Sequence, residues 1–305
     1  MAATLGALSL LFQVPAGATG QLRLPTPIPP QPASAEQAQP SGPALWKLGD
    51  DDTVIYLFGT VHALPATTEW LSPVIGHALD SAEELVTEVD LSDTHHVREQ
   101  FLARALLPEG QNLRNLLSQD DKLAYEAAMA GIGLPLAAFD RYKPWYAAMA
   151  MSLLPMAKAG FSPAAGVEAV LGKRHDAPGH KRTALESAEY QLDLFDSLPL
   201  QAQIAYLRDV STAVPDMSGN LGEMVETWLK GDADGLAELI NKNNSDPVLL
   251  EHLLFQRNRA WADWIEARLA SPGTVFMAVG AGHLAGPGSV QDELAARGFA
   301  VSRIQ

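Results

Sequence analysis

Apolar residues in this chain fall into short runs that end abruptly in glycine and histidine. The clearest run, residues 274–286, is rich in β-branched and aromatic side chains and stops at glycines that enclose His283. The same order recurs at residues 53–62, where an apolar stretch leads through Gly59 to His62. Runs of this length and composition are typical of buried strands. Both segments therefore predict a strand followed by a Gly-x-x-His loop.

More elements are expected around the first of these segments. Residues 45–48 and 53–59 predict a β-hairpin with an acidic turn, residues 67–79 have the spacing of an amphipathic helix, and residues 84–90 predict a strand that ends in carboxylates. The order strand, helix, strand is typical of a βαβ unit with a parallel pair of strands. Because ligands bind beyond the carboxyl ends of parallel strands, His62 and Glu88 are expected at a binding edge.

From about residue 95 to residue 269 the pattern is mostly helical. Amphipathic helices are predicted at 96–107, 119–130, 143–158, 198–213, 219–229, 233–242 and 247–270. A short strand at 181–185, a helix at 289–297 and an edge strand at 299–304 complete the prediction. The expected fold is α/β, with a central, mainly parallel sheet and a large, mostly helical insertion between the N-terminal strands and the C-terminal strand–loop–helix–strand.

The N-terminal region differs from the rest of the chain. Residues 1–21 carry no charge and join an apolar run to small residues, which is the pattern of a cleaved export signal without its usual basic start. The following residues are rich in Pro, Ala and Gln, as in an extended linker. We expect a signal peptide at 1–18, a linker at 19–42 and one domain at 43–305. Export predicts a periplasmic or secreted protein; the alternative is a cytoplasmic protein with a disordered tail.

Composition removes several classes of function. The net charge of −15 repels nucleic acid, so no nucleic-acid partner is expected. The chain has no cysteine, which excludes disulfides, thiolate zinc sites and a cysteine nucleophile. No later run of about 18 apolar residues occurs, so no transmembrane segment is expected.

Two histidines and a carboxylate at strand ends can form a site for a divalent metal such as Zn, Mn or Co. In such a site a carboxylate acts as a third ligand or as a general base for a metal-bound water. Glu88 is the better candidate than Asp90, because Val86 and Val89 flank it and an unpaired buried carboxylate is unfavourable. The alternative interpretation is that His62 and His283 each cap a strand through backbone hydrogen bonds.

The helix predicted at 247–270 contains a polar anomaly. Arg257 and Asn258 fall inside an apolar stripe formed by Leu254, Trp261 and Ile265. Polar groups on a buried face need partners. Arg257 either pairs with a buried acid, such as Glu168 or Glu186, or stabilises negative charge that develops on a substrate.

A nucleotide-binding interpretation of the second loop is disfavoured. Residues 280–285 match the weak G-x-G-x-x-A fingerprint after a strand. However, only about 20 residues follow, too few for the second strand with its ribose-binding acid.

Taken together, residues 57–62, 84–90, 166–168, 184–186, 256–259 and 279–286 resemble the TraB/GumN family. That family is related to the Tiki-type metalloproteases and, more distantly, to erythromycin esterase-like and ChaN-like folds. The resemblance spans roughly residues 45–304. It implies an active centre of His62, Glu88 and His283 around a divalent metal, and it matches Arg257 and Asn258 to an Arg-Asn helix pair.

The sequence-based hypothesis is an exported metal-dependent hydrolase that cleaves peptides or other small substrates. Its catalytic residues would be His62, Glu88, His283 and Arg257, the first three also being the metal ligands. Residues expected to support these ligands or to bind substrate are Asp90, Asn258, Glu168 and Glu186. The alternative is a non-catalytic protein that sequesters a peptide signal or haem in the same pocket, because two histidines can also hold haem iron.

Overall fold

A six-stranded sheet holds together the two Gly-x-x-His segments. The computed structural model describes residues 42–90, 94–242 and 246–305, so the predicted signal peptide and nearly all of the predicted linker lie outside the described residues. The strand order is β6-β4-β7-β2-β1-β8. In that order the strands are Lys181–Glu186, Glu84–Val89, Gly273–Gly280, Thr53–Thr60, Leu45–Gly49 and Ser302–Arg303.

The sheet is mainly parallel, as predicted. Strands β6, β4, β7 and β2 run parallel to their neighbours, whereas β1 pairs antiparallel with β2 as a hairpin and β8 is a short antiparallel edge strand. The prediction that β2 and β4 pair directly is wrong, because β7 lies between them. Val275 to Val279 form an apolar run that is buried throughout, which suits a central strand covered on both faces.

Alternate residues of the central strands face two different helix layers. On one face, Phe58, Leu85 and Phe276 pack against helices α1, α6, α9 and α10. On the other, Leu57 and Val275 pack against α12 and α13. These helices are Pro73–Asp80, Val167–His175, Met217–Leu229, Ala233–Lys242, Gln256–Leu269 and Val290–Ala296. Helices on both faces of a parallel sheet are the arrangement of α/β proteins.

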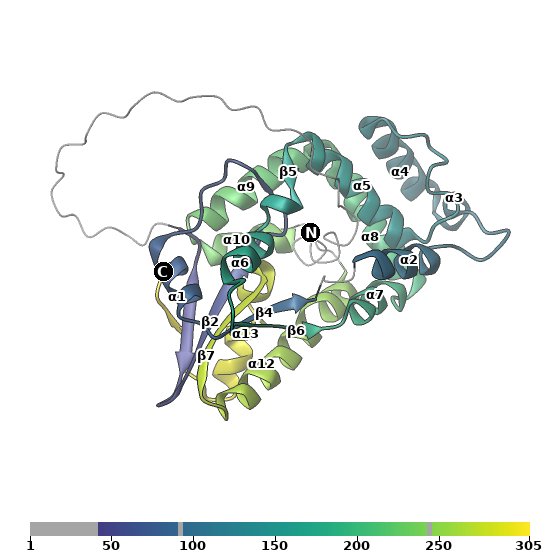
Figure 1. Cartoon of the computed structure of the whole chain (residues 1–305). Coiled ribbons are helices and arrows are strands. Elements are labelled where there is room, and N and C mark those ends of the chain that lie inside the picture. Colours follow the sequence, from purple (N-terminus) through teal and green to yellow (C-terminus); the bar gives the residue numbers. More distant parts are fainter. Residues whose placement is uncertain (1–41, 91–93, 243–245) are drawn as a thin grey trace, which may run out of the picture.

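The remaining helices form a second body beside the sheet, where α3, α4, α5 and α8 lie together (Figure 1). They pack around Trp145 and Phe101, which are fully buried. The helices are α2 Thr94–Arg104, α3 Leu113–Leu116, α4 Gln119–Ile132, α5 Pro144–Lys158, α7 Ala188–Asp196 and α8 Leu200–Ala213. Between these helices in the chain come α6, which packs on the sheet, and β6, which is one of its strands. They place Glu168 and Glu186 near the carboxyl edge of the sheet.

Several element boundaries differ from the prediction for local reasons. Helix α1 begins at Pro73, later than residue 67, because Ser72 accepts a hydrogen bond from the backbone N–H of Ile75 as its N-cap. Helices α6 and α7 were not predicted. The long helix predicted at 247–270 is divided into α11, Pro247–Leu250, a π-helical turn at Glu251–Phe255 and α12.

His175 provides a test of the packing between α6 and β6. Its ring is buried, stacks on His180 with a centroid distance of 4.4 Å, and burial followed by His180 lowers its pKa below 6.5. The unfolded chain takes up this proton at a higher pH than the folded chain, so stability is present above about pH 6.5 and is lost as pH falls through the folded pKa.

We therefore expect that the free energy of unfolding of His175→Gln falls less steeply between pH 7 and pH 5 than that of the unsubstituted protein. Urea unfolding at several pH values measures this slope. The exposed His77→Gln on α1 is the control and should keep the original slope. Identical slopes for all three proteins would contradict the assignment to His175.

Candidate active site

The carboxyl ends of four parallel strands meet at one edge of the sheet and carry the candidate residues. Glu186 ends β6, Glu88 lies near the end of β4, and His62 and His283 follow β2 and β7. His62, Glu88 and His283 are all buried, with 8%, 5% and 1% of their surfaces exposed. The parallel register of β4, β7 and β2 therefore brings together residues from both ends of the folded region.

Gly280 is the point around which these three side chains converge. A Cβ atom built on Gly280 would lie 3.0 Å from Oε1 of Glu88, 3.5 Å from Nε2 of His62 and 3.6 Å from Cδ2 of His283. The Gly280 N–H donates a 2.6 Å hydrogen bond to the same Glu88 oxygen. Glycine at this position lets the polar groups approach the backbone directly, whereas a Cβ atom would press on the Glu88 carboxylate.

His62 is held by a carboxylate on the opposite side of its ring. Its Nδ1 lies 2.5 Å from Oε1 of Glu168, and the hydroxyl of Thr60 donates to the same oxygen. With Nδ1 directed at Glu168, Nε2 faces Gly280. A carboxylate behind an imidazole fixes its orientation and raises its basicity, as it does for histidine ligands of metals.

The loop that supplies Glu168 approaches His62 closely at Gly166. A Cβ atom at this position would overlap the carbonyl group of His62, and the Val167 N–H donates to the carbonyl oxygen of Val61 at 3.1 Å. Only glycine allows this contact between the start of α6 and the end of β2. Residues 166–168 therefore act as one unit that presents Glu168 to His62.

We expect Gly166→Ala to separate His62 from Glu168 and to lower the midpoint of thermal unfolding. The matched control is Gly219→Ala in α9, where an added Cβ meets nothing within 4 Å and should be neutral or stabilising by up to about 1 kcal/mol. Calorimetry of both variants checks the expectation. An unchanged midpoint for Gly166→Ala would contradict the account, because it would show that the loop relieves the clash at no cost in stability.

His283 is held by an amide instead of a carboxylate. Its Nδ1 lies 2.6 Å from Oδ1 of Asn258, and the Asn258 side-chain N–H donates to the carbonyl oxygen of Gly288 at 2.7 Å. The second contact orients the amide so that its oxygen faces the imidazole. Because an amide oxygen only accepts, Nδ1 of His283 carries the proton and Nε2 presents a lone pair.

Arg257 links the two halves of the site, and all five of its N–H donors have partners. Nη2 donates to Glu88 at 2.6 Å and to Glu186 at 2.9 Å, and Nε donates to Glu186 at 2.8 Å. Nη1 donates to the carbonyl oxygen of Leu253 at 3.1 Å and lies 3.0 Å from Nε2 of His283. The pairing that the sequence left open between Glu168 and Glu186 is thus with Glu186, and also with Glu88.

This geometry favours a positioning task for Arg257 over direct contact with substrate. With its donors engaged and 2% of its surface exposed, the guanidinium has no N–H left for an oxyanion. It lies over Trp261, with 4.7 Å between Cζ and the ring centroid.

Two further residues belong to the site and were not predicted. Gln191 on α7 donates through Nε2 to Glu88 at 3.3 Å and to Glu186 at 3.1 Å, and Trp261 donates to Glu186 at 2.9 Å. Gln191 therefore holds both carboxylates that bind Arg257, and Trp261 holds one of them. Asp90 lies just beyond β4 and is exposed, unlike these residues.

Comparison with known proteins identifies the family of the chain. The model of the TraB/PrgY/gumN family matches residues 44–303, nearly the whole chain. The chain belongs to the TraB/PrgY/gumN family. No curated protein and no solved structure matches it. Within the part of this family member that the structure describes, no helix is long and apolar enough to cross a membrane.

The electrostatics of this TraB/PrgY/gumN protein assign distinct protonation states to the three central residues. Burial opposes ionisation of Glu88, but Arg257 and the two imidazoles hold its pKa far below its usual range. Burial and then the Arg257 charge lower the pKa of His283 to about 3. Burial also opposes the charged form of His62, yet the Glu168 carboxylate raises its pKa above 6.5. Glu88 is therefore ionised and His283 neutral near pH 7.

The donor set of this site fits a divalent cation in type and in charge. Nε2 of His62, Nε2 of His283 and Oε1 of Glu88 converge, and each imidazole is oriented by a partner on its other nitrogen. In the structure these donors belong to a hydrogen-bonded cluster, since Nε2 of His283 lies 3.0 Å from Nη1 of Arg257. In the described residues, no three His, Asp or Glu side chains are spaced so that they could hold a metal ion as they stand. A metal ion on His283 would replace its contact with Arg257.

Proposed function

We propose that this TraB/PrgY/gumN family member is an exported, metal-dependent hydrolase that cleaves peptides. The observation that carries the proposal is the convergence of Glu88, His62 and His283 on Gly280 at the carboxyl edge of a parallel sheet. That edge is where α/β enzymes bind their substrates. Two imidazoles and one carboxylate suit Zn, Mn or Co.

Charge balance supports a divalent ion at this position. The cluster contains the carboxylates of Glu88, Glu168 and Glu186 but only one guanidinium, that of Arg257. When both imidazoles are neutral, two negative charges remain uncompensated. A divalent cation neutralises them; without one, the excess negative charge is what raises the pKa of His62.

Each residue then has a defined task. His62, His283 and Glu88 would hold the ion, which would supply Lewis-acid chemistry by activating water at about pH 7 and polarising a carbonyl group. Arg257 keeps Glu88 ionised and His283 neutral, so that both are ready to act as ligands at neutral pH. Glu168 and Asn258 hold the two imidazoles in place. The buried surroundings exclude bulk water and strengthen these interactions.

Elemental analysis of purified protein tests the metal. We expect about one divalent ion per chain, and we expect its loss from both His62→Ala and His283→Ala. The exposed His77→Ala serves as the control and should retain the ion. A full complement of metal in both site variants would show that the ion, if present, binds elsewhere.

Incubation with a randomised peptide library, read by mass spectrometry, tests the reaction. Cleavage by the protein, its loss in EDTA and its return with Zn, Mn or Co are the expected results. If the metal-loaded protein binds peptides without cleaving them, the proposed hydrolase function is wrong and the protein instead sequesters peptides. The export component rests on the N-terminal sequence alone, and fractionation of the source cells checks it separately.

A further inference from the structure

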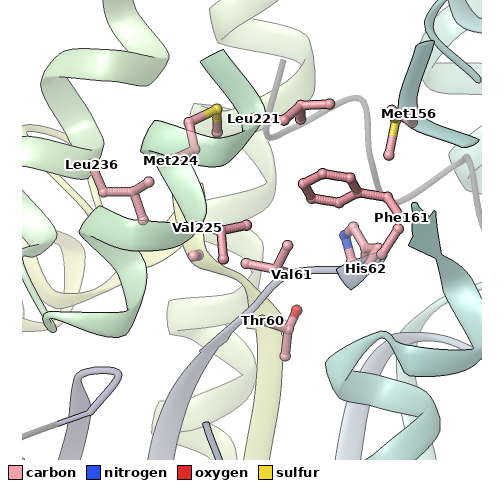
Figure 2. A pocket seen from close by; sticks show the side chains of 11 residues that line it. Thr60, Val61, His62, Met156, Phe161, Leu221, Met224, Val225 and Leu236 are labelled. Carbon is pink, nitrogen blue, oxygen red and sulfur yellow. The ribbon is translucent and has the colours of Figure 1, made fainter. Parts of the chain in front are cut away.

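An apolar recess opens directly beside His62. It contains about 450 Å³ of empty space, counting the solvent at its mouth. Figure 2 shows His62 and Phe161 on one side and Met224, Val225 and Leu236 on the other.

The recess offers almost nothing to a polar group. Among its lining residues, Thr60 and His62 alone carry polar side chains, and both are engaged with Glu168 through the Thr60 hydroxyl and Nδ1 of His62. The other walls are aliphatic, thioether or aromatic. A charged or amide-bearing group placed here would lose its hydration without gaining partners, which is unfavourable.

The recess and the candidate active site share one residue. His62 lines the recess while its Nε2 faces Gly280, where Glu88 and His283 also converge. A substrate whose reacting carbonyl lies at that point therefore has this apolar space as its immediate neighbour. Apolar pockets with a few convergent polar groups at one end are the usual form of a substrate site.

On the basis of the hydrolase function proposed above, we propose that this recess binds an apolar side chain of the peptide substrate, adjacent to the bond that is cleaved. It selects residues such as leucine and methionine at that position and rejects charged ones. Phe161 and Val225, from opposite sides, set the width of the recess (Figure 2). Met156 and Met224 can adjust to the shape of the occupant because their side chains are flexible.

Substitution at Val225 tests this assignment through specificity. Val225→Phe fills the recess from α9, and Leu229→Phe on the same helix, outside the recess, is the matched control. In the randomised library we expect enrichment of leucine and methionine at one position beside the cut. In Val225→Phe that preference shifts to alanine and glycine, and kcat/KM for a leucine peptide falls by about 10–200-fold relative to its alanine counterpart.

The outcomes separate this inference from the function on which it rests. Cleavage with no apolar preference, or an unchanged preference in Val225→Phe, overturns the role of the recess and leaves the hydrolase standing. No cleavage of any peptide by the metal-loaded protein overturns the hydrolase and the recess together. Phe161→Ala provides a second variant in case Val225→Phe does not fold; it widens the recess and should shift the preference toward phenylalanine and tryptophan.

Discussion

Arg257→Met is expected to lower the free energy of unfolding by about 3–5 kcal/mol, and the midpoint of thermal unfolding by roughly 10 °C. Glu88 and Glu186 both pair with this guanidinium, and their side chains are only 6% and 5% exposed. Removing the shared cation leaves two carboxylates buried without their counter-charge. Methionine retains much of the volume of arginine, so the loss in free energy of unfolding comes mainly from the missing charge and less from altered packing.

The control for this variant is Arg259→Met, two residues along the same helix. Arg259 pairs with Glu251 at the surface, where both side chains are more than 40% exposed, and such pairs contribute about 0–1 kcal/mol. Denaturant unfolding of both variants, in EDTA so that no ion compensates the carboxylates, measures the difference. Equal losses for Arg257→Met and Arg259→Met would contradict the account of a buried charge cluster.

The same network explains how Arg257 connects stability with chemistry. Nη2 of Arg257 lies 2.6 Å from Glu88, and Nη1 lies 3.0 Å from His283. One cation therefore keeps the carboxylate charged and the imidazole neutral, which are the states that ligation requires. A buried ion pair is weak support for stability as such, but here it sets the protonation of the neighbouring side chains.

Much of the sheet was predictable from local pattern, but its strand order was not. The apolar runs that become β2 and β7 are visible in the sequence because strands covered on both faces lack polar alternation. Nothing local indicates that β7, from the end of the chain, inserts between β2 and β4. That order depends on which runs bury the most apolar surface once the helices have formed, and this is a property of the whole chain.

Site residues were predictable where a polar side chain interrupts an apolar pattern. Arg257 and Asn258 were found because they lie in the stripe of Leu254 and Trp261 on α12. Gln191 carries the same signal, since it is buried beside Leu194 and Phe195 on one face of α7. It was missed because α7 itself was not predicted, so no helical face was available on which to recognise the anomaly.

The contacts between candidate residues were beyond prediction. The sequence indicated Glu168 and Glu186 as equal partners for Arg257, whereas the structure separates them: Glu168 binds His62 and Glu186 binds Arg257. The difference arises from Gly166, which brings α6 against the end of β2, and from β6, which pairs with β4 and ends at Glu186. Both are tertiary contacts between elements whose relative positions no local pattern contains.

Glu88→Gln is expected to reduce kcat for peptide hydrolysis by about 10²–10⁴-fold while the protein remains folded. Glutamine keeps the size of the side chain and an oxygen that can accept from the Gly280 N–H, but it lacks the negative charge proposed to hold the ion. Arg257 retains its two hydrogen bonds to Glu186, so its guanidinium stays paired with a carboxylate and the fold is expected to persist. Steady-state kinetics with circular dichroism separate the loss of activity from loss of fold.

Glu84→Gln is the matched control because Glu84 lies on the same strand and, by alternation, on the same face as Glu88. It pairs with Arg268 at the other end of α12, far from the Gly-x-x-His loops, and its neutralisation should leave kcat within about twofold. Equal kcat values in the two variants would show that β4 supplies no catalytic carboxylate. A loss confined to Glu88→Gln, with the metal content reduced in parallel, places the reaction at the end of β4 that faces Gly280.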